Sequence, residues 1–162
     1  MAGLDFDPIE RAAQLWADRI GDATSMRLAT SIMRVHQLLA ARLDAALRPF
    51  GITFARYEVL RLLSFSSSGS LPLSKIGERL MVHPTSVTNV IDRLVADGLV
   101  DRRVDPSDRR RALASLTDAG RQVLDDATQA LVAMDFGLDE ISPADQTTIH
   151  ELLTPLRRGD WD

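Results

Sequence analysis

The sequence contains no cysteine among its 162 residues. A disulfide framework, a thiolate zinc site and a thiol-based redox sensor are therefore excluded. No run approaches the roughly 18 apolar residues of a membrane span, so we expect no membrane partner. The first residues, MAGLDFDPIERAAQ, are acidic and lack the basic and then apolar layout of a signal peptide. These absences predict a cytoplasmic protein, and its length favours one domain.

The chain also lacks an overall basic charge, because its formal net charge is −4. That value alone argues weakly against nucleic acid, but the distribution of charge matters more than its sum. Residues 72–121 hold nine basic and seven acidic side chains, whereas the remaining residues hold ten and sixteen. Within 102–111, five arginines face two aspartates. An acidic body with one basic edge is compatible with binding phosphates.

Motifs of catalysis are absent as well. The three histidines, His36, His83 and His150, lie far apart in the chain and lack the spacing of metal ligands. No G-x-S-x-G, Walker-type or G-x-G-x-x-G motif is present. We therefore expect no catalytic residue, no metal and no cofactor. A small-molecule enzyme stays an alternative only if it uses a catalytic arrangement that these motifs do not describe.

What the chain does contain is helical periodicity interrupted by one hairpin pattern. Apolar residues recur at three- and four-residue spacing, and Ser, Thr, Pro and Gly mark the ends of the segments. The expected helices cover about 9–20, 24–47, 54–64, 74–81, 84–96, 117–136 and a last one from 143, and two strands cover 99–104 and 111–116. Within these, Thr53, Ser74 and Thr117 are the expected helix caps. The fold class is therefore mostly α with a small β-hairpin wing, as in a winged helix-turn-helix with N- and C-terminal dimerisation helices.

This order suggests a domain organisation. Residues 1–22 would form an N-terminal extension with a short helix, and residues 23–162 the winged-helix domain. Within that domain, a DNA-binding lobe of about 53–117 would lie between dimerisation helices of about 24–48 and 118–158. These outer helices carry more apolar surface than a small winged domain needs, which favours a homodimer. The alternative is that they only cover their own core.

The segment 83–96 has the composition of a helix that reads DNA. Val87, Val90, Ile91, Leu94 and Val95 follow the helical period and are expected in the core. Short polar side chains, which let a helix approach base edges closely, occupy the other side, namely Thr85, Ser86, Thr88 and Asn89, with Asp92 and Arg93 beyond them. The alternative is an ordinary solvated helix face.

The hairpin tip carries three consecutive arginines, Arg109, Arg110 and Arg111, after the turn residues 105–108. Arginine suits a narrow minor groove, because its weakly hydrated planar head tolerates the confined negative potential there. Asp108 is placed to hold the Arg110 guanidinium in one rotamer. Of Arg102 and Arg103 on the first strand, one is expected to contact a phosphate and the other to form a structural ion pair, and the sequence does not distinguish them. The alternative is a solvated basic turn.

These residues together resemble the MarR family of bacterial winged-helix regulators over about residues 25–157. The resemblance is carried by VHPTSVT (82–88), DRL (92–94), GLV (98–100), DPSDRR (105–110) and LTDAG (116–120). It implies a homodimer that binds a pseudo-palindromic operator in double-stranded DNA, usually as a repressor. By position, the DNA-binding residues would be His83, Thr85, Ser86, Thr88, Asn89, Arg93, Arg102, Asp108, Arg109 and Arg110. His83 stands where relatives often have a serine cap, so its ring is expected to contact DNA as well.

The resemblance also implies a small aromatic or anionic ligand, bound where the dimerisation helices meet the DNA-binding lobe. The pocket residues would be Trp16, His36, Glu58 and Arg102. Trp16 and Arg102 match the branch of the family that answers to urate, with Glu58 in place of its aspartate. Val90 stands where that branch has a second arginine, so the resemblance does not extend to urate itself. The alternatives are plain packing of the N-terminal helix for Trp16, and a core or pocket-wall position for His36.

The sequence therefore indicates a sequence-specific DNA-binding transcriptional regulator of the MarR type, a homodimeric repressor that a small molecule releases. A winged-helix protein-interaction module that does not bind DNA is the alternative, against which the wing arginines argue.

Overall fold

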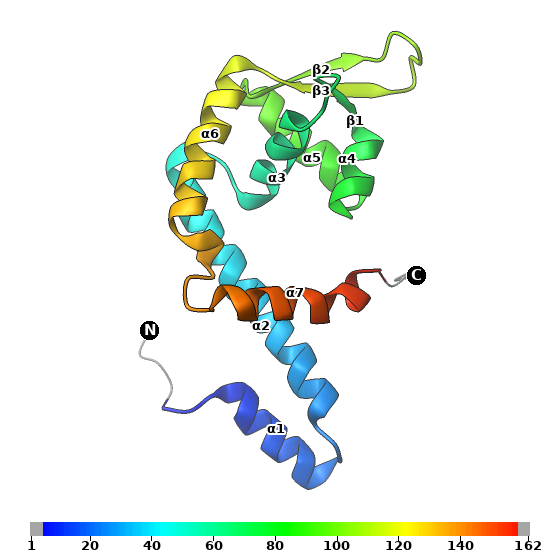
Figure 1. The fold of residues 1–162 in the computed structure, drawn as a ribbon. Coiled ribbons are helices and arrows are strands. Elements are labelled where there is room, and N and C mark those ends of the chain that lie inside the picture. The colour runs from blue at the N-terminus through cyan, green and yellow to red at the C-terminus, as the bar shows by residue number, and fades with distance from the viewer. Residues whose placement is uncertain (1–4, 159–162) are drawn as a thin grey trace. The chain divides into compact units, whose positions relative to one another are not determined.

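A computed structural model of the chain describes residues 5–158. Helices predominate and a small antiparallel sheet accompanies them, which confirms the predicted fold class (Figure 1). The chain forms two compact units, residues 1–42 and 43–162. Within residues 5–158, every helix is too short or too polar to cross a membrane. The predicted extension 1–22 begins with four residues that lie outside the described part.

The first unit holds α1 (Pro8–Arg19) and most of α2 (Thr24–Leu47), as the periodicity predicted. Asp7 begins α1 by accepting the Ile9 N–H at 2.8 Å. Asp22 accepts both the Thr24 hydroxyl at 2.8 Å and the Thr24 N–H at 3.2 Å, and these bonds lower the pKa of its carboxyl. An exposed ion pair of Arg27 with Glu10, 3.3 Å, links the two helices. Local side-chain chemistry therefore sets this corner.

The second unit has one apolar core. Its helices are α3 (Phe54–Ser64), α4 (Leu73–Leu80), α5 (Pro84–Ala96), α6 (Asp118–Ala133) and α7 (Pro143–Arg158), with two 3-10 turns, η1 (Arg48–Phe50) and η2 (Asp135–Gly137). The most deeply buried large side chains come from α2, α3, α4, α5, α6 and the sheet: Leu47, Leu60, Leu63, Ile76, Ile91, Leu94, Val100, Leu124 and Leu131. The α3–α5 helices therefore share one core with the sheet and α6.

The sheet has three strands rather than the two that were predicted. β2 (Val100–Val104) and β3 (Ala112–Leu116) form the expected hairpin, and β1 (Leu71–Pro72) adds an edge strand in the order β1-β3-β2. Leu71 pairs with Ala114, and Pro72 with Leu113. This pairing fixes the chain just before α4, so that Pro72 precedes the helix and no side chain caps it. The prediction that Ser74 caps this helix was therefore wrong.

The corner between α6 and α7 also differs from the prediction. The helix was expected to continue to about Phe136, but it ends at Ala133, and Asp135 and Phe136 adopt left-handed φ angles of 47° and 51°. The Gln146 side chain holds this corner by donating to the Asp135 carboxylate at 2.7 Å. The turn follows from contacts with the next helix, which the local sequence does not show.

The base of the hairpin is joined to α6 by a close backbone contact. Thr117 caps α6 by accepting the Gly120 N–H at 2.9 Å, and its hydroxyl donates to the Gly98 carbonyl at 2.8 Å. Its N–H donates to the Leu99 carbonyl at 3.2 Å. A Cβ at Gly120 would lie 2.1 Å from the Leu99 carbonyl oxygen. Only glycine allows α6 to approach the hairpin so closely.

Replacing Gly120 with alanine is expected to lower the free energy of unfolding by more than about 3 kcal/mol, because a backbone oxygen cannot rotate away from the new methyl group. Gly98→Ala is the control, since Gly98 has a φ of 72° but open space around it. It should cost only the left-handed strain of about 1–2 kcal/mol. Urea denaturation followed by circular dichroism would compare them, and equal losses would contradict the steric explanation.

Candidate nucleic-acid interface

Helix α5 presents an apolar side to the core and a polar side to solvent. Val87, Ile91 and Leu94 are at most 2% exposed. The side chains of Thr85, Ser86, Asn89, Asp92 and Arg93 are exposed, as predicted, whereas Thr88 is half-buried. Val95 was expected in the core but is 38% exposed. After α5 the chain turns at Gly98, and the Leu99 N–H donates to the Leu94 carbonyl. This turn places the buried Leu99 side chain over the end of the core, where Val95 was expected.

The first turn of α5 is ordered by its own side chains. His83 is the N-cap, and its Nδ1 accepts the Thr85 N–H at 3.3 Å. The Thr88 hydroxyl donates to the Pro84 carbonyl at 3.1 Å. The side chains of Thr85, Ser86 and Asn89 make no hydrogen bond within the described residues. They are therefore available to bind base edges or phosphates.

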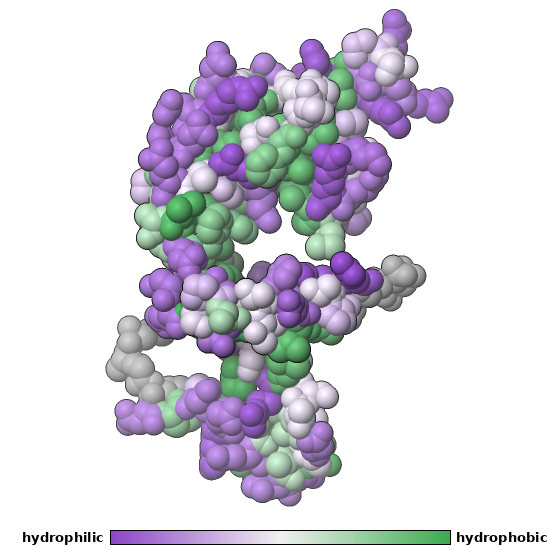
Figure 2. Space-filling view, viewed as in Figure 1, coloured by the Kyte–Doolittle hydropathy of each residue, from purple (hydrophilic) through white to green (hydrophobic). Residues whose placement is uncertain are grey.

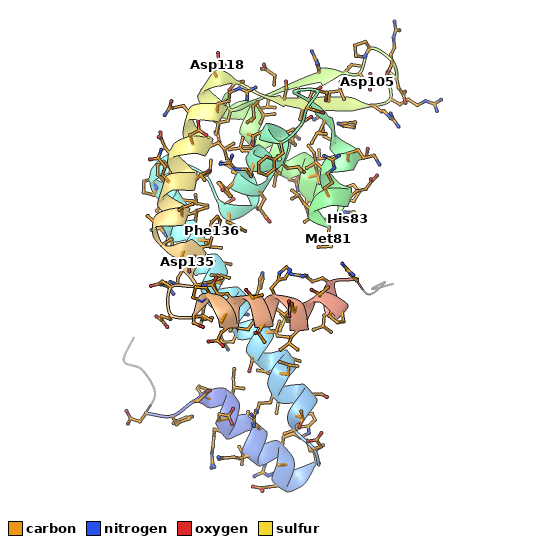
Figure 3. All side chains as sticks on the ribbon, viewed as in Figure 1. Met81, His83, Asp105, Asp118, Asp135 and Phe136 are labelled. Atoms are coloured by element: carbon orange, nitrogen blue, oxygen red, sulfur yellow. The ribbon has the colours of Figure 1, made fainter. Side chains whose placement is uncertain are left out.

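The hairpin tip is a polar, internally bonded turn that projects from the sheet (Figures 2 and 3). The Asp105 carboxylate accepts the Ser107 hydroxyl at 2.7 Å and the Ser107 N–H at 2.8 Å, and these bonds lower its pKa. The Asp105 N–H donates to the Arg111 carbonyl at 2.9 Å. These three hydrogen bonds close the loop from which Arg109 and Arg110 extend.

Asp108 does not hold the Arg110 guanidinium, contrary to the sequence-based prediction. One of its oxygens accepts the backbone N–H of Arg110 at 3.0 Å, and the other lies 3.5 Å from Nε of Arg111. The guanidinium groups of Arg109 and Arg110 have no partner within the described residues. Asp108 orders the backbone at the tip, because an aspartate two residues before an N–H closes a turn more readily than it reaches a long side chain.

The pairing of strands decides between Arg102 and Arg103. Successive side chains of a strand point to opposite faces, so Arg102 shares the face of the buried Val100 and of its register partner Ala114. On that face Arg102 forms an ion pair with Asp92 of α5, 2.7 Å from Nη1 to Oδ1. Arg103 lies on the other face, and its guanidinium has no ionic partner among the described residues. Arg102 is therefore the ion-paired arginine, and Arg103 is the free one.

The sequence did not identify Asp92 as the partner of Arg102. Asp92 was predicted only to lie on the polar side of α5, beside Asn89 and Arg93. Its charge was opposite to that of two candidate arginines, Arg102 and Arg103, but a choice between them needs the register of β2 against α5. No signal in the sequence supplies that register.

The proposed ligand-pocket residues are distributed over both units. Trp16 and His36 belong to the first unit and Glu58 and Arg102 to the second. Glu58 is exposed on α3, yet partial burial raises the pKa of its carboxyl. Two surface hollows, of about 460 and 430 Å³, lie between α4 and the start of α5 and at the corner of α1 and α2. Neither hollow is lined by any of the four residues, so the pocket stays a prediction.

The chain was compared with protein families and with known proteins. The model of the MarR family matches residues 52–112, which span α3 to the start of β3. The HTH-type transcriptional repressor Rv2887 of Mycobacterium tuberculosis is 30% identical over 116 residues, 72% of this chain and 82% of that protein. Alignments with four curated regulators of Bacillus subtilis are partial, and the chain spans 61%, 69%, 47% and 57% of their lengths.

Solved structures extend the similarity to nearly the whole fold. Sco5413, a MarR family transcriptional regulator from Streptomyces coelicolor, is 55% identical with a TM-score of 0.78, over 83% of this chain and 93% of that one. A mutant of MarR from E. coli, complexed with operator DNA, is 25% identical with a TM-score of 0.73, over 88% of this chain and 97% of that one. On this evidence the chain belongs to the MarR family, whose members are DNA-binding transcription regulators and not enzymes.

Proposed function

We propose that this chain is a sequence-specific, homodimeric repressor that binds a pseudo-palindromic operator and is released by a small aromatic or anionic ligand. The observation that carries the proposal is the pairing of a polar α5 surface with a basic hairpin tip in one unit. The similarity to a MarR structure in complex with operator DNA supports it. So does the similarity to the HTH-type transcriptional repressor Rv2887.

The contacts with DNA are assigned by chemistry. Thr85, Ser86 and Asn89 would face the major groove, where an asparagine can pair with adenine and hydroxyls can serve bases or phosphates. Arg110 would enter the flanking minor groove, and its free guanidinium supports this role. His83, Thr88, Arg93 and Arg109 would complete the surface. Asp108 would act through the backbone of Arg110, and Arg102 through its ion pair with Asp92.

A second copy of the chain is the proposed cover for exposed apolar side chains on two helices. In α7, Leu152 is 71% exposed, and Ile149 and Leu156 are also exposed. In α2, four large apolar side chains are exposed, namely Leu28, Met33, Val35 and Leu38. Groups of exposed large apolar side chains are typical of an interface. A dimer would present two α5 helices to half-sites one helical turn apart, roughly 34 Å.

The proposed release by a ligand rests on the resemblance and on Glu58. Partial burial raises the pKa of the Glu58 carboxyl, and shifted pKa values are common at functional sites. Binding of an anionic or aromatic molecule would shift the dimer towards a conformation in which the distance between the DNA-binding lobes of its two subunits no longer fits the half-sites. Trp16, His36 and Arg102 remain the other proposed pocket residues.

The test of DNA binding is fluorescence anisotropy with DNA from upstream of the protein's own gene. Arg110→Ala is expected to weaken operator binding by on the order of tenfold or more, because a groove contact is worth about 1–3 kcal/mol. Arg48→Ala in η1, an exposed arginine outside α5 and the hairpin, is the control with the same loss of charge. A series of salt concentrations should show strong salt dependence for the wild type.

Binding that is weak, indifferent to sequence and equal in the two variants would contradict the proposal. It would favour the second candidate function, a winged-helix module for protein interaction, whose partner should bind with little dependence on salt.

The dimer can be tested independently of DNA. Leu152→Asp places a charge among the exposed apolar residues of α7 and is expected to convert the dimer into a monomer, because burying an unpaired carboxylate is strongly unfavourable. Thr147→Asp, about 140° around the same helix, should leave the dimer intact. Light scattering coupled to size-exclusion chromatography measures both masses. A monomeric wild type, or a dimeric Leu152→Asp variant, would rule out this interface.

A further inference from the structure

At its base the hairpin is joined to α5 by a backbone bond, from the Leu99 N–H to the Leu94 carbonyl at 2.9 Å. Beyond that base, the ion pair between Asp92 and Arg102 is the only hydrogen bond or salt bridge between α5 and the strands β2 and β3 among the described residues. Within residues 5–158, the other polar side chains of α5 bond within the helix or have no hydrogen-bond partner. Among polar contacts, this single pair therefore sets the direction of the hairpin relative to α5 beyond its base.

The hairpin itself is well ordered beyond that point. β2 and β3 are paired over their whole length, from Val100 with Leu116 to Val104 with Ala112. Bonds between Asp105, Ser107, Asp108 and Arg111 close the tip. Past Arg102 the strand leaves the core, since Val104 is 60% exposed. The paired strands and the tip should thus move as one body, and Arg102 is the last side chain of β2 that is fastened to α5.

The two partners are also exposed enough to exchange contacts. The side chain of Arg102 is 39% exposed and that of Asp92 is 55% exposed. An exposed pair contributes little to the free energy of unfolding. Its location, between the helix with the proposed base-reading side chains and the strand that leads to Arg110, gives it a different consequence. It can align two DNA contacts without holding the fold together.

We propose that Asp92 is a positioning residue, which through Arg102 sets the hairpin so that α5 and Arg110 reach the operator together. Arg102 is then a structural member of the interface rather than a phosphate contact. This inference rests on the proposed function, because it assigns the geometry of the same DNA-binding surface.

The proposal and simple electrostatics predict opposite effects of removing the Asp92 carboxylate on operator affinity. If Asp92 were only an acidic group beside DNA, its removal would strengthen binding, since it repels phosphates and occupies an arginine. If it positions the hairpin, its removal weakens binding. Asp92→Ala is therefore expected to reduce operator affinity by on the order of three- to tenfold, within the range of couplings between members of one contact network.

The control and the rescue are available in the chain. Asp101 directly precedes Arg102 in β2, and its side chain points to the opposite face of the sheet. Asp101→Ala removes the same charge as Asp92→Ala and should not weaken binding. Asp92→Glu keeps the carboxylate and should restore most of the affinity. In an Arg110→Ala background, Asp92→Ala should have little further effect, because the contact that it positions is already lost. Anisotropy with operator DNA and a thermal melt, which should barely change, would be recorded for each variant.

A second measurement does not require DNA. The chain lacks cysteine, so Ser86→Cys and Arg109→Cys, at two exposed positions, allow one spin label on α5 and one at the hairpin tip. With unlabelled protein in excess, the distance distribution within one chain should broaden when Asp92 is replaced by alanine and stay narrow when Asp101 is.

Unchanged or tighter operator binding by Asp92→Ala, or an unchanged distance distribution, would overturn the positioning role. If instead the wild type fails to bind its operator while Asp92→Ala broadens the distance distribution as expected, the proposed function is wrong. The role of Asp92 in orienting the hairpin relative to α5 would then still hold.

Discussion

The burial of one side of α5 is the constraint from which the DNA-binding surface follows. Val87, Ile91 and Leu94 are almost completely removed from solvent. A fully buried aliphatic side chain is worth about 1.5–3 kcal/mol, whereas an exposed polar pair is worth at most about 1 kcal/mol. The rotation of the helix about its axis is therefore set by its apolar side, and Thr85, Ser86 and Asn89 are exposed as a consequence.

The hairpin is held by different means. Backbone pairing within the sheet fixes its shape, and the close approach of Gly120 to Leu99 fixes its base against α6. Aspartates organise its basic residues: at the tip, Asp105 and Asp108 accept backbone N–H groups, and on β2, Arg102 pairs with Asp92 of α5. Acidic residues near a proposed phosphate-binding surface thus order the arginines and their backbone, and the guanidinium groups of Arg109 and Arg110 have no partner in the described part of the chain.

Much of the fold could be predicted from the sequence because it depends on neighbours in the chain. The bounds of α2, α3 and α5 agree with the periodicity and the caps. Thr53 and Thr117 cap as predicted, because a cap bond spans only three residues. The predictions that failed involve distant partners or competing neighbours. Ser74 does not cap α4, because the pairing of Leu71 and Pro72 with β3 places the start of the helix before it. Val95 is exposed, and Leu99 is buried at the end of the core instead.

The candidate site divides in the same way. The sequence alone determined that a polar helix face and an arginine-rich turn follow one another, since both are patterns over a few residues. Only the tertiary structure decided which arginine of β2 is engaged, because Asp92 and Arg102 are ten residues apart and meet only when α5 and the sheet pack together. It also decided that Asp108 bonds to the Arg110 backbone and leaves that guanidinium free. Periodicity is a local property of the chain, whereas the choice of an ionic partner depends on which surfaces the core brings into contact.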